Sequence, residues 1–425
     1  MKLLKTSFDL VIVGGGPAGA AAALYAKKHG LSVCLLDRAY FPRDKVCGDA
    51  LSGKSLAILL DLGLLEKVRS LPGAQINTVV FGSPNCVNAS IDLSSRPLHD
   101  TATGRDIRME GSVIKREIFD NFLFQEAKTV IDQCHEGFRV TKLFQNNQVV
   151  TGIEGKFDNG ETVEISSNLV FGCDGFSSIV ARQSDLYLHD SRHCVVAIRQ
   201  YYENVKGLDG QIELHFVPEV LPGYFWAFPL DNGCANIGIG MLHESIRGKN
   251  VDLRKALTQV ISRPPFAERF AEARPLEKPV GWNLPVGSIR RKAHKDGVLL
   301  LGDAAGLIDP FTGEGIGNAL YSAKYAVETA VEAKQAGDFS ASFLQRYENR
   351  LWDSLGDELK TSTRMQNLGK WKPLLNLVID KAATNEKVSD MICAMIANAL
   401  PKNELTSPLF YLKLLFNTLP KRRNR

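Results

Sequence analysis

The chain has 425 residues, of which 44% are hydrophobic and 23% are charged, and its formal net charge is +4. This composition is typical of a globular protein of roughly two or three structural units, and the charge is too small to indicate nucleic acid as a partner. No apolar run of about 18 residues is present and the N-terminus carries no secretory signal, so we expect a cytoplasmic protein without a membrane span.

The eight cysteines are scattered along the chain, without a CxxC pair or neighbouring histidines at metal-ligand spacing. We therefore expect reduced cysteines and predict no metal site. The eight histidines form no cluster, and no Ser-His-Asp or paired-carboxylate arrangement is visible.

The strongest motif stands near the N-terminus, where FDLVIVGGGPAGAAAALYAKKHGLSVCLLDR predicts strand, glycine loop, helix, strand and a terminal acid. Gly14 permits the tight turn, Gly16 lets a pyrophosphate approach the backbone, and Gly19 lets the helix pack closely on the strand. The helix N-terminus offers free N–H groups to phosphates, and Asp37 would accept a hydrogen bond from a ribose hydroxyl. This order of elements predicts a dinucleotide-binding site.

Two later segments repeat the pattern of a buried strand followed by a turn, LVFGCDGFSSIVAR at 169–182 and VLLLGDAAGLIDPFTGEGIGNAL at 298–320. With the glycine loop, these DG and GD motifs resemble the FAD-dependent oxidoreductases of the para-hydroxybenzoate hydroxylase type. The resemblance implies non-covalent FAD, with Asp303 holding its ribityl chain. It also implies that the helix opened by Gly315 and Gly317 points its N-terminus at the flavin pyrimidine ring, where a helix dipole stabilises negative charge.

Three further segments narrow the resemblance. GSVIKREIFDNFLFQEAK at 111–128 resembles the family helix whose arginine, here Arg116, lies near the cofactor phosphates or ribose. FPRDKVCGDALSGKSLAILLDLGL at 41–64 and PGYFWAFP at 222–229 resemble the geranylgeranyl reductase family, which carries a PRxKxCG loop and a PxxYxWxFP stripe. This resemblance implies that reduced FAD hydrogenates isoprenoid carbon–carbon double bonds in a long apolar cavity.

The rings of Tyr224, Trp226 and Phe228, hereafter the aromatic stripe, stand at every second position and so share one face of a strand. Such a face is more often core than cavity wall. The resemblance favours a cavity wall, because an isoprenoid chain forms no hydrogen bonds and gains roughly 0.8 kcal/mol per buried methylene on apolar surface. The substrate is expected to contact the aromatic stripe and Pro229.

The expected cofactor contacts fall within the motifs already described. They are Gly14, Gly16, Pro17, Ala18, Gly19, Asp37, Arg38, Arg43, Cys47, Gly48, Arg116, Asp174, Gly175, Asp303, Gly313, Gly315, Ile316 and Gly317. No second dinucleotide motif is found, because Gly238 and Gly240 are not followed by a helix pattern. The reducing equivalents are therefore expected from transiently bound NAD(P)H or from a protein donor such as a ferredoxin.

Residues 42–49, hereafter the cysteine loop, raise the question of a proton donor. Cys47 is either a small packed residue or a catalytic thiol near the flavin that gates, orients or donates a proton. Arg43 and Lys45 could depress a thiol pKa. We expect Cys47 to line the cavity, whereas Lys45 and Asp49 are expected to shape the loop or face solvent.

Three alternatives remain. An aromatic hydroxylase, a monooxygenase, has the same motifs but commonly reads GDAAH, where this chain has Gly306 after GDAA. A flavin-dependent halogenase carries WxWxIP rather than YFWAFP. A flavin-binding electron carrier would not need an apolar stripe.

The predicted fold class is α/β, with a Rossmann-type FAD-binding domain, an inserted antiparallel-sheet substrate domain and a C-terminal helical region. We expect the FAD-binding domain at 1–73, 108–186 and 284–335, the substrate domain at 74–107 and 187–283, and the helical region at 336–425. The tail SPLFYLKLLFNTLPKRRNR is amphipathic and basic, so either it contacts a membrane surface peripherally or it packs over the cavity.

Overall fold

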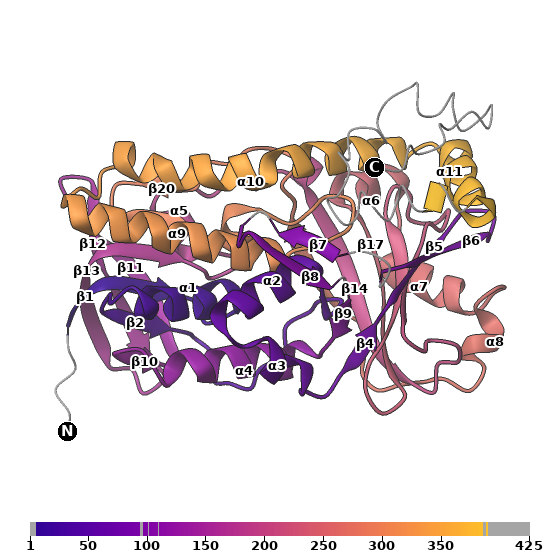
Figure 1. The fold of residues 1–425 in the computed structure, drawn as a ribbon, viewed down its shortest axis with the longest axis horizontal. Helices are drawn as coiled ribbons and strands as arrows, with labels where there is room; N and C mark the ends of the chain where they lie inside the picture. The colour runs from indigo at the N-terminus through magenta and orange to yellow at the C-terminus, as the bar shows by residue number, and fades with distance from the viewer. Residues whose placement is uncertain (1–5, 94–96, 101, 109, 386–387, 390–425) are drawn as a thin grey trace.

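The computed structural model describes residues 6–93, 97–100, 102–108, 110–385 and 388–389. Two large sheets lie side by side along the molecule, and helices cover them (Figure 1). The amphipathic tail at 407–425 lies outside the described residues. Within the described part, no helix is long and apolar enough to cross a membrane.

The first sheet is parallel at its centre. Its strands are β1 (Ser7–Val13), β2 (Val33–Leu36), β10 (Gln133–His135), β11 (Phe138–Asn146), β12 (Val149–Phe157), β13 (Thr162–Gly172), β20 (His294–Lys295) and β21 (Val298–Leu300). The parallel order is β10-β2-β1-β13-β21, and the β11–β12 hairpin joins the first half of β13 antiparallel. The carboxyl ends of these parallel strands meet at one edge, which places Gly14, Asp37 and Asp174 together.

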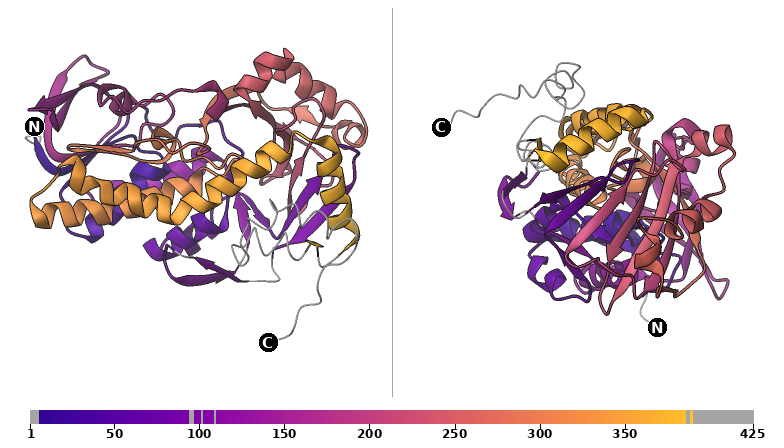
Figure 2. Two further views of the ribbon diagram at one scale, coloured as in Figure 1. Left: turned by 90° about the horizontal axis from the view of Figure 1, so that it is seen from above. Right: turned by 90° about the vertical axis from the view of Figure 1, so that its right-hand side faces the viewer.

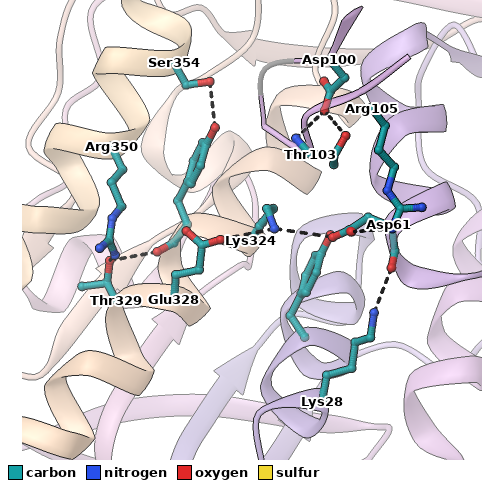
Figure 3. A network of polar contacts seen from close by, with 12 residues as sticks. Lys28, Asp61, Asp100, Thr103, Arg105, Lys324, Glu328, Thr329, Arg350 and Ser354 are labelled. Atoms are coloured by element: carbon teal, nitrogen blue, oxygen red, sulfur yellow. Dashed lines mark hydrogen bonds and ion pairs between the residues drawn. The ribbon is translucent and has the colours of Figure 1, made fainter. Parts of the chain in front are cut away.

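Helices cover both faces of this sheet, which explains why β1 is a continuous apolar run. They are α1 (Pro17–Lys28), α2 (Gly53–Leu62), α3 (Leu65–Arg69), α4 (Arg116–Lys128), α5 (Ile179–Gln183), η2 (Gly302–Ala305) and α9 (Ile316–Ala336). Asp61 of α2 is a polar junction between them (Figure 3). Its backbone carbonyl accepts from Lys28 at 2.8 Å, and its carboxylate lies 3.5 Å from the ammonium of Lys324.

The second sheet is mostly antiparallel, in the order β18-β14-β17-β16-β15-β5-β6 with β19 beside β14. Its strands are β5 (Thr78–Gly82), β6 (Asn88–Asp92), β14 (Cys194–Glu203), β15 (Gln211–His215), β16 (Tyr224–Pro229), β17 (Cys234–Leu242), β18 (Arg274–Pro275) and β19 (Val280–Pro285). One face packs with α7 (Leu253–Ile261) into an apolar cluster around Phe225 and Ile237. The opposite face is turned toward the first sheet.

The remaining strands and helices complete the fold. They are β3 (Ala50–Leu51), β4 (Ala74–Ile76), β7 (Pro97–Asp100), β8 (Arg105–Arg108), β9 (Gly111–Val113), η1 (Ser191–His193), α6 (His243–Lys249), α8 (Ala267–Phe270), α10 (Ala341–Leu368) and α11 (Lys372–Thr384). Helix α10 runs along the molecule from β20 of the first sheet toward the second, and α11 turns onto β6 (Figures 1 and 2). The predicted fold class is confirmed.

Candidate active site

A cavity of about 1150 Å³ lies between the two sheets. Single-ligand pockets usually measure about 300–1,000 Å³, so this volume has room for a cofactor and a second molecule. Of the expected contacts, all but Gly19, Gly317 and Pro229 border the cavity. The three exceptions have structural positions instead: Gly19 packs on Gly14, Gly317 on α2, and Pro229 is buried at the end of β16.

The glycine loop has the geometry of a phosphate site. Gly14 has a left-handed φ of 105°, and a Cβ added there or at Gly19 would collide with backbone. At Gly16, by contrast, an added Cβ would meet only Arg43 Nη2, at 3.4 Å. Helix α1 begins after Gly16 with no side-chain cap, so its N-terminal N–H groups face the cavity unpaired by a side chain. An anionic group fits in this space.

The acid at the end of β2 is already ordered for a ribose. Asp37 accepts the backbone N–H of Gly15 at 2.7 Å and that of Ala39 at 2.8 Å, which fixes its carboxylate at the cavity wall. Arg38 beside it is exposed. Asp174 has a different task, because its oxygens accept from Ser178 Oγ at 2.5 Å and the Ile179 N–H at 2.6 Å at the start of α5. Its cofactor contact therefore stays a prediction.

Arg43 and Arg116 share one counter-ion. Arg116 donates to both oxygens of Asp120, at 2.6 and 2.8 Å, and Arg43 donates to Asp120 at 2.9 Å. Asp120 and Arg116 are both more than nine-tenths buried. Although burial lowers it, the pKa of Arg116 is well above its usual value because of the Asp120 carboxylate and the Cys47 thiol. Two guanidinium groups on one carboxylate leave a net positive charge beside Gly16, which suits a pyrophosphate.

The loop before α9 supplies the remaining cofactor surface. Asp303 lines the cavity, and within the described residues its carboxylate forms no hydrogen bond or ion pair, so it can accept from a ribityl hydroxyl. Helix α9 begins at Ile316, with Gly315 as an N-cap that provides no side-chain bond. The backbone N–H of Gly317 is taken by Glu314 at 2.6 Å, which leaves Ile316 at the cavity-facing start of the helix. The residues present fit FAD.

The aromatic stripe borders the cavity and also packs. Trp226 and Phe228 are each 7% exposed. Trp226 donates from Nε1 to Asn236 Oδ1 at 2.8 Å, and Phe228 lies against Gly48 of the cysteine loop. Strand alternation places Pro229 on the opposite face, so we do not expect it to contact the substrate.

Asp49 shapes the cysteine loop, which is one of the two roles expected for it. This residue is fully buried, not solvent-facing, and its Oδ2 accepts from Tyr201 and from Asn236 Nδ2, each at 2.7 Å. Burial raises its pKa to about 6 against the lowering effect of those donors. Asn236 also donates to the carbonyl oxygen of Cys47 at 2.8 Å, so it connects the loop to Trp226. Lys45 is half-buried and lines the cavity instead of facing solvent.

The far end of the cavity is apolar. Strands β5, β6 and β15 form one wall, and α10 and α11 form the other. The lining side chains include Val79, Phe81, Ile91, Leu214, Phe216 and Phe311 on one side and Met365, Leu375, Val378 and Ile379 on the other. Such a chamber suits a hydrocarbon chain.

Sequence patterns missed the helices α10 and α11 as cavity walls, because nothing local distinguishes a core face from a cavity face. Arg199 was also missed, although an arginine directly after the apolar run CVVAI was an available signal. It is fully buried and bonds to Asp44 at 2.5 Å and Glu277 at 2.6 Å. It thereby fixes the cysteine loop to β14.

Comparisons with known proteins agree with this site. Residues 7–351 match the model of the FAD binding domain family. A digeranylgeranylglycerophospholipid reductase of Methanococcoides burtonii is 32% identical over 361 residues, which are 84% of this chain and 82% of the relative. A geranylgeranyl bacteriochlorophyll reductase-like protein of Thermoplasma acidophilum has the same fold, with a TM-score of 0.82 at 24% identity over 96% of this chain and 99% of that chain. A flavin-dependent brominase has a TM-score of 0.75 at 18% identity, over 97% of this chain and 99% of its own.

The fold and the cofactor site define an FAD-dependent oxidoreductase. The chain belongs to the geranylgeranyl reductase family of these enzymes.

Proposed function

We propose that the enzyme hydrogenates carbon–carbon double bonds of an isoprenoid chain carried by a lipid, a diphosphate or a quinone. One observation carries the proposal. The aromatic stripe contacts the cysteine loop through Phe228 and the loop before α9 through Tyr224, and it continues into the apolar chamber. A hydrocarbon chain in that chamber would pass directly by the flavin position. The names of the relatives, which are lipid reductases, support the same substrate class.

When bound and reduced, FAD supplies a hydride. The protein must then place an alkene against it, exclude water and provide a proton. The rings of Tyr224, Trp226 and Phe228 present flat apolar surface for the alkene. Their faces also stabilise developing positive charge, by roughly 0.5–2 kcal/mol for a cation over a ring. An isolated alkene accepts hydride poorly, so protonation of one carbon makes the other a better acceptor.

The competing functions are those of a monooxygenase and a halogenase. The fold alone does not distinguish either of them from a reductase, because a brominase has the same fold. The chemistry of the chamber favours reduction. Among the described residues, most of the side chains that line its far walls are aliphatic or aromatic, and α10 adds the polar Ser362. A hydrocarbon chain is the ligand that such walls recognise.

We further propose that electrons come from transiently bound NAD(P)H or from a ferredoxin-like donor, and that the basic tail at 407–425 brings the enzyme to a membrane surface. The tail proposal rests on its sequence pattern, in which apolar residues fall on one helical face before Lys421 and Arg422. Truncation after Thr406 should abolish co-sedimentation with anionic vesicles without unfolding the protein. Equal sedimentation of both forms would contradict it.

The reaction is tested with dithionite-reduced enzyme under anaerobic conditions, with geranylgeranyl diphosphate and a digeranylgeranyl glycerolipid as probes. The expected product gains two hydrogens per double bond by mass spectrometry, and oxygen is not required. A product that forms only with oxygen and gains its mass would show a monooxygenase. A halogenated product in the presence of chloride or bromide and oxygen would show a halogenase.

A further inference from the structure

Lys45 of the cysteine loop lies in the cavity wall, and neither cofactor binding nor the aromatic stripe accounts for its side chain. Its ammonium lies 4.5 Å from the centroid of the Trp282 ring, and both residues border the cavity. Within the described residues, this ammonium makes no ion pair and donates no hydrogen bond. Lys45 is therefore a cation of the cavity wall that is not bound in an ion pair.

Neighbouring cations in the cavity wall are in a different state. Four of them have a carboxylate partner: Arg43 and Arg116 with Asp120, Lys54 with Glu358, and Arg199 with Asp44 and Glu277. Those ion pairs hold their cations in fixed positions, whereas the ammonium of Lys45 contacts a ring face and feels the Asp303 carboxylate only through space. Burial without a bound counter-ion favours the neutral amine over the ammonium, so such a group releases its proton more readily than an exposed lysine.

We propose that Lys45 donates the proton in the reduction, which rests on the proposed function. The N–H bond of the ammonium breaks and its proton forms a C–H bond at one alkene carbon. A hydride from the reduced flavin forms the other C–H bond, the π bond is consumed, and Lys45 remains as a neutral amine. The alkene gains two electrons and the flavin loses them.

The charges around Lys45 favour this assignment. The step consumes a negative charge on the reduced flavin and the positive charge on Lys45, and neutral products are better tolerated in an apolar cavity than the separated ions. Burial lowers the pKa of Lys45, the Asp303 carboxylate acts in the opposite direction, and the Arg116 cation lowers it again. Cys47 and Asp120 are the other charged or titratable neighbours, and both raise that pKa.

The amine can regain its proton after each turnover. The neighbouring Asp44 has a side chain that is 45% exposed, so the loop connects the cavity wall to bulk water. Cys47 is the competing donor in the same loop. Its thiol is hydrogen-bonded to Arg116, beside the expected pyrophosphate position, whereas the Lys45 side chain is held by no hydrogen bond within the described residues.

The test compares Lys45→Met, Lys45→Arg and Cys47→Ala with the exposed control Lys67→Met. Single turnover of the anaerobically reduced enzyme should slow by about 100-fold or more in both Lys45 variants, because general acids contribute roughly 10²–10⁴-fold. FAD content and prenyl-probe affinity should stay within about threefold. Arginine retains the charge but does not release its proton, so a Lys45→Arg enzyme at the wild-type rate would overturn the proposal. Loss in Cys47→Ala alone would assign the step to the thiol and also overturn it.

A second readout needs no flavin. Acylation of the apoprotein across a pH series, followed by peptide mass spectrometry, gives the midpoint at which each lysine becomes a reactive amine. Lys45 should have a midpoint below that of the exposed Lys67, independent of how fast either reacts. A midpoint at or above that of Lys67 would overturn the assignment.

The pH dependence links the two readouts. The protonated form of Lys45 is the active one, so the single-turnover rate should fall as the pH rises through its lowered pKa, and Lys45→Met should lose this limb. If the wild-type enzyme hydrogenates no prenyl probe at any pH, the proposed function fails, and the acylation midpoint still reports separately on Lys45.

Discussion

The hydroxyl of Tyr224 donates a hydrogen bond of 2.6 Å to the carbonyl oxygen of Thr312. This bond joins the aromatic stripe to the loop that leads into α9. The next residue, Gly313, has a left-handed φ of 76°, and a Cβ there would lie 2.8 Å from the same hydroxyl. The aromatic stripe and the loop before α9 are thus held together by one side chain.

Tyr224→Phe should weaken FAD binding by about 1 kcal/mol, because the Thr312 carbonyl loses its donor while the ring remains. FAD titration of the apoprotein measures this. Tyr202→Phe is the matched control, since that hydroxyl bonds to Gln200 on the opposite face of the same sheet. Equal weakening in both variants would mean that general loosening of the sheet, and not the Tyr224–Thr312 bond, sets the affinity.

Gly16→Val should give a folded but colourless protein. The space beside Gly16 is open apart from the end of the Arg43 side chain, so valine fits the apoprotein but occupies the pyrophosphate position. Loss of two charge-assisted hydrogen bonds would lower FAD affinity by about a hundredfold or more. FAD absorbance per protein is the measurement, with Gly248→Val in the exposed α6 as control. A fully loaded, yellow Gly16→Val protein contradicts the phosphate site.

Trp226 tests whether the aromatic stripe binds substrate or only packs. Trp226→Phe keeps most of the apolar surface but leaves Asn236 Oδ1 unpaired, a cost of about 1–3 kcal/mol. Trp226→Ala should cost roughly 3–5 kcal/mol in stability if the ring is core. We expect both variants to retain FAD and to turn over prenyl substrate more slowly.

The control for Trp226 is Phe225→Leu, which changes the buried opposite face of the same strand. It should lower the melting temperature without changing the Michaelis constant for the prenyl substrate. If Trp226→Ala behaves in the same way, with the remaining folded enzyme fully active, the stripe is core and not substrate wall.

Asp49→Asn should change how stability depends on pH. The folded-state pKa of Asp49 is raised to about 6, so the folded wild-type protein holds this proton more tightly than the unfolded chain does. That contribution is complete below about pH 4 and is lost as the pH rises through about 6, on the order of 3 kcal/mol. Asparagine does not ionise, so the variant should gain stability relative to wild type between pH 4 and 7, measured by urea unfolding. A constant difference would contradict a buried, ionising Asp49.

Much of the cofactor site follows from the sequence because its determinants are local. A tight turn, an open phosphate space and a close helix–strand contact each require glycine at one fixed position within a six-residue loop. Gly14, Gly16 and Gly19 have the geometry expected of each. The alternation that put Tyr224, Trp226 and Phe228 on one face is equally local.

The aromatic stripe shows what strand periodicity cannot predict. Strand periodicity fixes that the three rings share a face, but only the arrangement of the two sheets decides that this face borders a cavity. Gly306 gives a similar lesson. It separates reductases from hydroxylases in the motif comparison, yet its φ of 69° is left-handed and a Cβ there would lie 2.4 Å from Arg291 Nη1, so a side chain would strain the backbone and displace that guanidinium.

The polar interior was decided only by the tertiary structure. The Asp49 carboxylate is buried because Tyr201 and Asn236 donate to it from 152 and 187 positions away. Lys45 forms no ion pair because Asp120 and Asp44 are bound by arginines from distant parts of the chain, and Asp303 acts on it only through space. Hydrophobic periodicity and glycine geometry act between neighbours in the chain and can be read from it, whereas the environment of a charge depends on distant residues that meet only after folding.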